Sequence, residues 1–502
     1  MLISLPAFLY ALITTLVAYI LARFAYRALV VKGRLPPGPR GLPFIGNVFD
    51  MPTDKPWQTF GHWGETYGDV CSATVFGQTF VILNYFETAV DLLDKRGSVN
   101  SERPHLTMGG DMVGWKSAIG LLPNGSVLRK QRKLMHSIFG AHVVGKLHKV
   151  QETTALQLVR DLIDTPDKFD HHISHRIVSF ILSITYGYEV EEDGDALVEL
   201  VDRAMASFSE VTVPGAFLVD QMPFLRFLPE WIPGMAFKSK ARQWAKDLDD
   251  MVNVPYKFTE RQMATGVENT SFVSALLRDK SVTEHDLKWT AATIYGAAGE
   301  TTTATIKVFL LTMMLFPGAQ KEAHAELNDV LQGRRLPTHQ DRDKLPYVNA
   351  LCKEVLRFHP AVPLSVPHGT AQDDVYNDYL IPKDSMILAN LRKMTHDPAV
   401  YEDPEVFNPS RFLPGLGRVP ERDPRSIIFG FGRRKCPGQY LADEMIFIVC
   451  ATVLSVFDIS KVDGFSQEPV LEPLNGTVSH PAPFKCSITP RSSGAVDLIG
   501  AM

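Results

Sequence analysis

The sequence predicts a mainly α-helical fold with small β-sheets, and two helical patterns are the main reason. Residues 285–316 are polar in their first turns and apolar afterwards, and Pro317-Gly318 stops them, which predicts one long helix. Residues 345–359 predict a shorter helix that ends before Pro360. No repeat, low-complexity tract or obvious linker divides residues 41–490. We therefore expect a single domain over residues 41–490 and a C-terminal tail over residues 491–502.

The N-terminal residues 1–22 predict a transmembrane signal-anchor helix. They contain no charged side chain, and 18 of the 22 are apolar. A helix of this length spans about 33 Å, enough for a bilayer core of about 30 Å. The basic residues that follow predict a single-pass protein of the endoplasmic reticulum membrane with its catalytic domain in the cytosol. A cleaved secretory signal peptide is the alternative, but no basic segment precedes the long apolar run.

Residues 23–40 predict a basic and Pro-rich hinge. They contain Pro36-Pro37-Gly38-Pro39, and proline both fixes its own φ and favours an extended residue before it. We expect a semi-rigid spacer that holds the domain near the membrane.

Short strands are expected at two places in the domain. Val70–Val75 and Thr79–Leu83 are separated by Gly77-Gln78 and predict a β-hairpin. Residues 375–389 alternate around a Pro-Lys-Asp turn and predict short strands. Residues 395–426 are rich in Pro, Asp and Arg and predict an irregular, ordered segment.

The composition excludes several classes of protein. The 502 residues are 45% hydrophobic and 21% charged, which excludes collagen-like, coiled-coil and fully disordered chains. The net charge of −5 gives no indication of a nucleic-acid partner. Five cysteines are too few for a disulfide framework and odd in number, so a reducing compartment fits best.

Residues 429–438, Phe-Gly-Phe-Gly-Arg-Arg-Lys-Cys-Pro-Gly, carry the most chemical information. Cys436 lies among glycines, which let a backbone approach a flat partner, and cations, which lower the pKa of a thiol. Pro437 suits the first position of a helix, whose dipole also favours a thiolate. A Gly-rich turn with an incidental cysteine is the alternative. We expect the remaining cysteines to be buried small hydrophobic residues: Cys71, Cys352, Cys450 and Cys486.

This stretch resembles the haem-binding signature of the cytochrome P-450 superfamily at every fixed position. The matching residues are Phe429, Gly432, Arg434, Cys436 and Gly438. The resemblance implies a cytochrome P-450 fold with one haem domain and haem b as the cofactor. It implies that Cys436 is the axial thiolate ligand of the iron, and thiolate ligation favours O–O bond cleavage. It also implies that Arg434 pairs with a haem propionate and that the phenylalanine and glycines of the stretch, Gly430 included, line the cofactor.

A second motif supports the resemblance. Glu354 and Arg357 lie three residues apart on the shorter predicted helix and resemble the ExxR element of the superfamily. Arg411 matches the third member of the family's triad, although Ser410 replaces the glutamate that usually precedes it. A surface ion pair is the alternative for Glu354 and Arg357 alone. We expect the triad to be a folding element and not a catalytic one.

Residues 297–302, Ala-Ala-Gly-Glu-Thr-Thr, resemble the oxygen-activation motif on the long helix. Glu300 and Thr301 are the acid and the alcohol that the resemblance implies as catalytic residues. Oxygen activation consumes two protons, and a hydroxyl can hold a water that a nearby carboxylate supplies. Helix-interior threonines without a role are the alternative, which we favour for Thr303 and Thr305. Ala298 departs from the glycine that is common there.

Other positions match the family's propionate-binding residues less completely. Arg132 matches the arginine of a Trp-x-x-x-Arg element, but Leu128 replaces its tryptophan. His368 follows Val-Pro where the family often has another propionate partner. Arg392 stands where a tryptophan is more usual.

The resemblance implies an enzyme that receives electrons from NADPH–cytochrome P-450 reductase, with cytochrome b5 as a further possible donor. The basic runs Arg129–Lys133 and Arg433–Lys435 are expected to share one face and to attract an acidic flavoprotein. The alternative is that these charges only solvate a surface or bind propionates.

The substrate expected from the resemblance is a lipophilic molecule that is oxidised with O2 in fungal secondary metabolism. Terpenoids are the class that we favour. The apolar, Pro-broken stretch Val213–Phe237 falls where the family has its substrate entrance. It either dips into the bilayer or packs as an ordinary loop. Residues 293–296, 361–366 and 477–478 are expected to line the pocket. The rival functions are a haem-thiolate isomerase or dehydratase without a reductase, which Glu300-Thr301 argues against, and a non-catalytic haem or lipid carrier.

Overall fold

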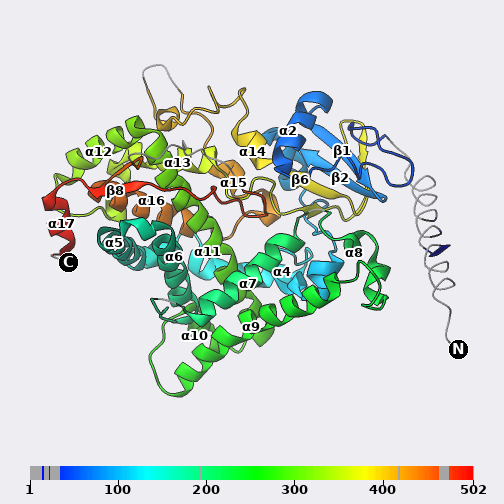
Figure 1. The fold of residues 1–502 in the computed structure, drawn as a ribbon, viewed down its shortest axis with the longest axis horizontal. Coiled ribbons are helices and arrows are strands. Elements are labelled where there is room, and N and C mark those ends of the chain that lie inside the picture. The colour runs from blue at the N-terminus through cyan, green and yellow to red at the C-terminus, as the bar shows by residue number, and fades with distance from the viewer. Residues whose placement is uncertain are drawn as a thin grey trace. The chain divides into compact units, whose positions relative to one another are not determined.

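The computed structural model describes residues 34–192, 194–213, 215–415, 419–462 and 474–500, and the isolated positions 14, 15, 18 and 22. The predicted anchor over residues 1–22 otherwise lies outside the described residues and stays a prediction. The chain groups into two compact units. Figure 1 shows the helices and strands, coloured in chain order. Unit 1 comprises residues 1–104 and 364–393, and unit 2 comprises residues 105–363 and 394–502.

Unit 1 contains most of the β-structure. Its helices and strands are α2 (Pro56–Tyr67), β1 (Val70–Val75), β2 (Gln78–Leu83), α3 (Phe86–Ala89), the π-helix η1 (Val90–Lys95), β3 (His368–Gly369), β4 (Asp374–Tyr376), β5 (Tyr379–Ile381) and β6 (Met386–Ala389). The helix α14 (Leu391–Thr395) begins here and ends in unit 2.

The main sheet of unit 1 has the strand order β1-β2-β6-β3. β1 and β2 pair antiparallel, which confirms the predicted hairpin, and β6 pairs parallel to β2. The 375–389 region also forms strands as predicted, because β4 and β5 pair antiparallel and β6 joins the main sheet. One face of this sheet packs against Phe60 and Trp63 of α2.

The described part of the predicted hinge is attached to unit 1. The backbone carbonyl of Pro37 accepts a hydrogen bond from the Ser72 N–H at 2.8 Å, and Pro36 accepts one from the Ser72 hydroxyl at 2.5 Å. A Cβ at Gly38 would lie 1.8 Å from the Ser72 carbonyl oxygen, so only glycine fits this approach. The Pro-rich segment therefore lies along strand β1.

Unit 2 is mostly helical, and α11 confirms the predicted long helix. Its α-helices are α4 (Ser126–Phe139), α5 (His148–Asp164), α6 (Phe169–Tyr186), α7 (Ala196–Val211), α8 (Leu218–Gln221), α9 (Phe237–Ala264), α10 (Phe272–Leu277), α11 (Glu284–Leu315), α12 (Pro317–Leu331), α13 (Pro346–Phe358), α15 (Arg425–Ile428), α16 (Gln439–Val456) and α17 (Ser493–Gly500). Its shorter 3₁₀ and π elements and strands are η2 (Thr107–Val113), η3 (Trp115–Ser117), η4 (Val144–Leu147), η5 (Pro166–Lys168), η6 (Pro223–Phe227), η7 (His339–Lys344), η8 (Pro409–Phe412), η9 (Gly432–Arg434), β7 (Phe457–Ser460) and β8 (Ser487–Pro490).

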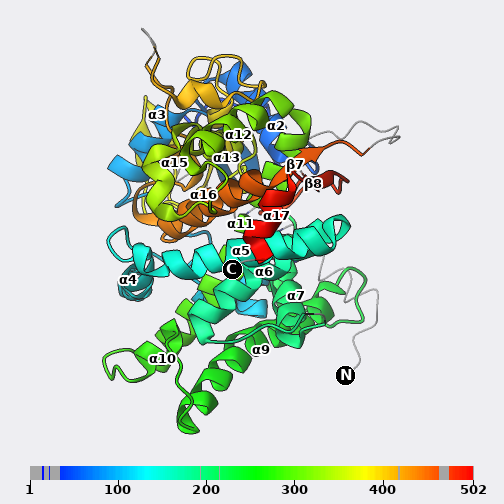
Figure 2. The same cartoon turned by 90° about the vertical axis from the view of Figure 1, so that its left-hand side faces the viewer.

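The long helix α11 lies at the centre of unit 2. It packs against α4, α6 and α16, and α5 packs against α6 and α16 (Figure 2). The Thr283 side chain caps its N-terminus by accepting a hydrogen bond from the Asp286 N–H. Nearly all side chains from Thr302 to Met314 are buried, so the apolar second half of the helix forms the core.

One helix of the described part of the chain, α16, is by itself long and apolar enough to cross a membrane. Two thirds of it (67%) is buried inside the protein, as is typical of a core helix. The pair α11 and α12 meets the same criterion together but is bent by 103°.

Candidate active site around Cys436

The predicted cysteine stretch forms a tight loop that ends at α16. The Cys436 N–H donates a hydrogen bond of 2.7 Å to the Phe429 carbonyl, which closes the loop. Gly430 and Gly432 have φ values of +72° and +52°, a region that favours glycine over residues with a Cβ. We expected Pro437 to be the first residue of the helix. Instead Gly438 caps α16, and Pro437 precedes the cap. The glycines of the motif therefore shape the backbone that presents the thiol.

The surroundings of Cys436 differ from those of the other cysteines. Burial raises the pKa of its thiol, but the Gly438 N–H and the charges of Arg132 and Lys435 lower it. Burial raises the pKa of Cys71 to about 11 and that of Cys486 to about 12, and no cation opposes it there. Of Cys71, Cys436, Cys450 and Cys486, Cys436 is the one whose pKa nearby cations lower, which suits a thiolate beside a metal cation.

Two predicted cofactor-binding arginines converge on this loop. Arg132 on α4 donates from Nη2 to the Lys435 carbonyl at 2.8 Å. Arg434 is buried and donates from Nη2 to the Leu122 carbonyl at 2.7 Å. The structure therefore brings together Arg132, Arg434 and Cys436 within unit 2.

The predicted alcohol lies on an accessible part of α11. Thr293, Ala297 and Thr301 follow one another at four-residue spacing, so they share a face of the helix. Ala297 is exposed and both threonines are half-buried, whereas residues 302–306 are buried. The Thr301 hydroxyl donates to the Ala297 carbonyl at 2.9 Å. Ala297 and the two threonines are thus less covered than the residues that follow them on the helix.

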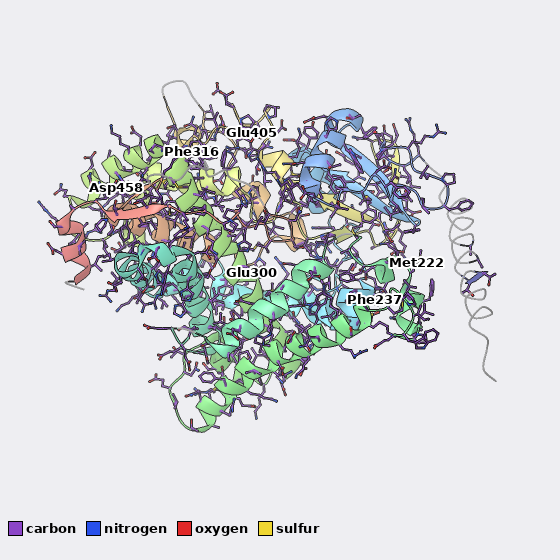
Figure 3. The ribbon with its side chains drawn as sticks, viewed as in Figure 1. Met222, Phe237, Glu300, Phe316, Glu405 and Asp458 are labelled. Atoms are coloured by element: carbon purple, nitrogen blue, oxygen red, sulfur yellow. The ribbon has the colours of Figure 1, made fainter. Side chains whose placement is uncertain are left out.

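The predicted acid, Glu300, holds its proton unusually tightly. Burial and the charge of Asp202 raise the pKa of Glu300 to about 7, and Lys307 opposes them. Figure 3 marks the position of Glu300 on α11. A carboxyl with a pKa near neutral pH is suited to donate and accept protons.

Comparison with known proteins decides the family. The family model described as cytochrome P450 matches residues 36–488. The chain belongs to the cytochrome P-450 family. It is 48% identical over 477 residues to cytochrome P-450 monooxygenase 208 of Postia placenta, covering 94% of this chain and 93% of that protein. It is 42% identical to cytochrome P-450 monooxygenase claR of Ampulloclitocybe clavipes (94% and 89% covered) and 38% identical to tryptamine 4-monooxygenase of Psilocybe cyanescens (96% and 98% covered).

Cytochromes P-450 are oxidoreductases with a haem iron and an axial cysteine thiolate, and this loop fits such a group. It offers a thiol with cations nearby and two arginines suited to propionates. Gln131, beside Arg132, is fully buried, and neither atom of its amide has a hydrogen-bond partner among the described residues. An unpaired buried amide is costly, so a polar ligand group near α4 is consistent with this observation.

The predicted triad is confirmed by the structure. Glu354 and Arg357 are both 0% exposed, and the Arg357 Nε donates to Glu354 at 2.7 Å. Arg411 donates from Nε to the same carboxylate at 3.2 Å and from Nη1 to Glu421 at 2.7 Å. Ser410 is exposed, so the missing glutamate does not disturb the triad.

The remaining predicted residues lie on β3, α4, α11 and α14 (Leu391–Thr395). His368 lies on β3 in unit 1, where its Nδ1 lies 2.9 Å from the Asn100 carbonyl oxygen, and its role toward a propionate stays a prediction. Leu128 is buried on α4, and Ala298 is half-buried on α11. Nothing in the structure explains why Arg392 replaces a tryptophan.

Sequence reasoning missed the charged neighbours of Glu300. Asp202 comes from α7, and Lys307 forms an ion pair of 2.7 Å with Asp170 of α6. These residues belong to no local motif, and only the packing of three helices brings them together. The spacing of seven between Glu300 and Lys307, two helical turns on one face, was the one signal in the sequence.

Proposed function

We propose that this chain is a membrane-anchored monooxygenase of fungal secondary metabolism. It inserts one oxygen atom from O2 into a C–H bond or double bond of a lipophilic organic substrate. NADPH–cytochrome P-450 reductase supplies the electrons, with cytochrome b5 as a second donor. The N-terminal anchor would hold the enzyme on the cytosolic side of the endoplasmic reticulum membrane.

The observation that carries this proposal is the acid–alcohol pair on the accessible part of α11. Haem, when held by Cys436, supplies the iron that activates O2. Glu300 would hold a proton near neutral pH, and Thr301 would hold a water that passes this proton on. Arg132 and Arg434 would fix the propionates through charge-assisted hydrogen bonds.

The pair also separates the proposal from its rivals. A haem-thiolate isomerase or dehydratase rearranges its substrate without consuming NADPH, so it needs no supply of protons to oxygen. A carrier needs neither a proton donor nor a reductase. The retention of Glu300 and Thr301, and the names of the relatives as monooxygenases, favour turnover with O2.

A cationic surface beside the cysteine loop supports docking of a reductase. Arg129, Lys130 and Lys133 are exposed on α4, and Arg433 is exposed on η9. The hydrogen bond from Arg132 to the Lys435 carbonyl joins the two basic runs. Acidic partners are steered by such a surface, and added salt screens the attraction.

The substrate entrance that we propose exposes large apolar side chains. Leu218, Phe227 and Trp231 are 52%, 74% and 66% exposed within the predicted segment Val213–Phe237. Met222 and Phe237, which flank the η6 part of this segment, are labelled in Figure 3. Exposed aromatic and aliphatic side chains suit a membrane surface, from which a lipophilic substrate would enter. A terpenoid is the class we would test first, and an arylalkylamine second, because one relative is named tryptamine 4-monooxygenase.

The test is NADPH consumption by the purified full-length holoenzyme with purified reductase, combined with a product screen by mass spectrometry. The screen uses a yeast host that expresses the chain with the reductase. We expect products 16 Da heavier than their substrates and dependent on NADPH. Product formation without NADPH or reductase would establish the isomerase or dehydratase instead.

A further inference from the structure

Two histidines and a glutamate from three separate elements meet in unit 2, away from any sequence motif. His148 is the first residue of α5, His339 is the first residue of η7, and Glu444 lies on α16. Their ligand atoms all lie within 4.8 Å of one another. The Glu444 Oε2 lies 3.7 Å from the His148 Nε2 and 3.8 Å from the His339 Nε2. Two donors on a tetrahedral zinc ion are roughly 3.4 Å apart, so these distances need only a small adjustment.

Both imidazoles present an unused nitrogen to this point. The Nε2 atoms of His148 and His339 are buried and have no hydrogen-bond partner among the residues that the structure describes. The His339 side chain is only 2% exposed. A buried polar atom without a partner costs free energy that a ligand would recover. The two rings are stacked with their centroids 3.9 Å apart and are nearly parallel, so both must tilt before their in-plane lone pairs can meet at one ion.

A second carboxylate fixes the protonation of His339. The Glu152 Oε1 accepts the His339 backbone N–H at 3.0 Å and lies 3.1 Å from its Nδ1. The Nδ1 therefore carries the proton as a donor to this carboxylate, which leaves Nε2 with its lone pair. A carboxylate that holds the far nitrogen of a metal-binding histidine is the usual support of such sites.

The backbone that carries His339 is held in place before any ligand binds. Thr338 and Asp341 form a capping box at the start of η7. Arg335 holds Asp341 through two hydrogen bonds of 2.6 Å. A rigid turn lowers the entropy that metal binding would otherwise cost.

Arg342, the cation next to the cluster, has a second carboxylate partner. Arg342 lies 3.0 Å from the Glu444 Oε2, and a metal would compete with it for this oxygen. Its Nη2 also donates to Asp443 at 2.7 Å, so Arg342 keeps a carboxylate when Glu444 turns to a metal. The His148 and Glu444 side chains are 34% and 21% exposed, so the cluster lies close to the protein surface.

We propose that His148, His339 and Glu444 form a site for a divalent transition metal of the zinc class, separate from the haem. Two imidazoles, one carboxylate and a water are a donor set that zinc accepts. The ion would join the starts of α5 and η7 to α16, the helix that follows Cys436.

The experiment measures zinc on the full-length holoenzyme, purified with a tag that contains no histidine. The protein is treated with a chelator, dialysed against Zn²⁺, and analysed for zinc and iron by mass spectrometry. We expect about one tight zinc per iron in the wild type. His148→Asn and Glu444→Gln should each weaken zinc binding at least tenfold, with the iron content unchanged. Glu152→Gln keeps all three ligands and should weaken binding by about 10- to 100-fold.

His62→Asn is the matched control, because His62 also lies near a glutamate, Glu65 at 3.4 Å, but is exposed. This variant should bind zinc like the wild type. The proposal is overturned if the wild type takes up no zinc, or if His148→Asn and Glu444→Gln bind it as tightly as the wild type. The zinc content is independent of turnover, so it tests the metal site whatever the substrate is.

Discussion

Replacing Glu354 by Gln should destabilise the protein more than almost any other single isosteric change. The Glu354 carboxylate accepts four hydrogen bonds, from the Arg357 Nε and Nη2 at 2.7 and 2.8 Å, the Arg411 Nε at 3.2 Å and the Asn408 N–H at 2.8 Å. The side chains of Glu354, Arg357 and Arg411 are at most 1% exposed, so water cannot replace the lost charge. Gln has nearly the same shape as Glu but is neutral, so the guanidinium groups of Arg357 and Arg411 would lose the negative charge that they now share.

The expected loss follows from this burial. Removing one partner of a buried ion pair costs about 3–5 kcal/mol, a large part of a total stability of about 5–15 kcal/mol. Arg411 retains Glu421, and Arg357 retains the carbonyls of Thr395 and Pro404, so we expect the lower part of this range. With a slope of a few kcal/mol per M of urea, the midpoint should fall by roughly 1 M.

The assay is urea unfolding of the holoenzyme, followed by far-ultraviolet circular dichroism and by the Soret band. Lys95→Gln is the control, because the Lys95–Asp91 ion pair is exposed at its lysine and should contribute nothing measurable. Equal midpoints for Glu354→Gln and Lys95→Gln would refute the reasoning that the buried triad stabilises the fold.

Four further predictions concern the chemistry. Cys436→Ser should abolish the red-shifted Soret band of the reduced CO complex, and persistence of that band would exclude Cys436 as the ligand. Thr301→Ala should raise peroxide release per NADPH, measured with a peroxidase-coupled dye; unchanged coupling would mean that another group holds the water. The raised pKa of about 7 leaves Glu300 protonated below neutral pH and ionised above it, so product formed per NADPH should fall as the pH rises through 7. Glu300→Gln should remove this step, and a step that survives belongs to another group. The double variant Lys130→Glu and Lys133→Glu should slow reduction by the reductase more at low salt than at high salt, and equal rates would argue against docking there.

The elements of the fold that could be predicted are those whose signals are local. The 285–316 pattern ends at Pro317, and the hairpin surrounds Gly77, so α11 and the β1–β2 pair were predictable. The parallel pairing of β2 with β6 was not predictable, because it joins residues that are about 300 positions apart. No short pattern encodes which strand lies beside which when the connection is that long.

The candidate site also contains residues that local motifs indicate and residues that only the fold brings together. Cys436, Arg434 and the Glu354–Arg357 pair belong to motifs with fixed spacing, so the sequence alone indicated them. The His148 and His339 cluster has no spacing signature, because its three members come from three elements. The helix was expected to begin at Pro437 but begins two residues later, at Gln439, because Gly438 supplies the cap of α16.

The proton affinity of Glu300 depends on which of the charges around it are already paired. Lys307 would lower the pKa of Glu300, but its ammonium lies 2.7 Å from the Asp170 carboxylate, which cancels part of its charge. Burial and the charge of Glu199 raise the pKa of Asp202 as well, whereas Arg203 and Lys307 lower it. The motif around Thr301 thus identifies Glu300 as the acid. Burial and the charges that two other helices bring near it set its pKa.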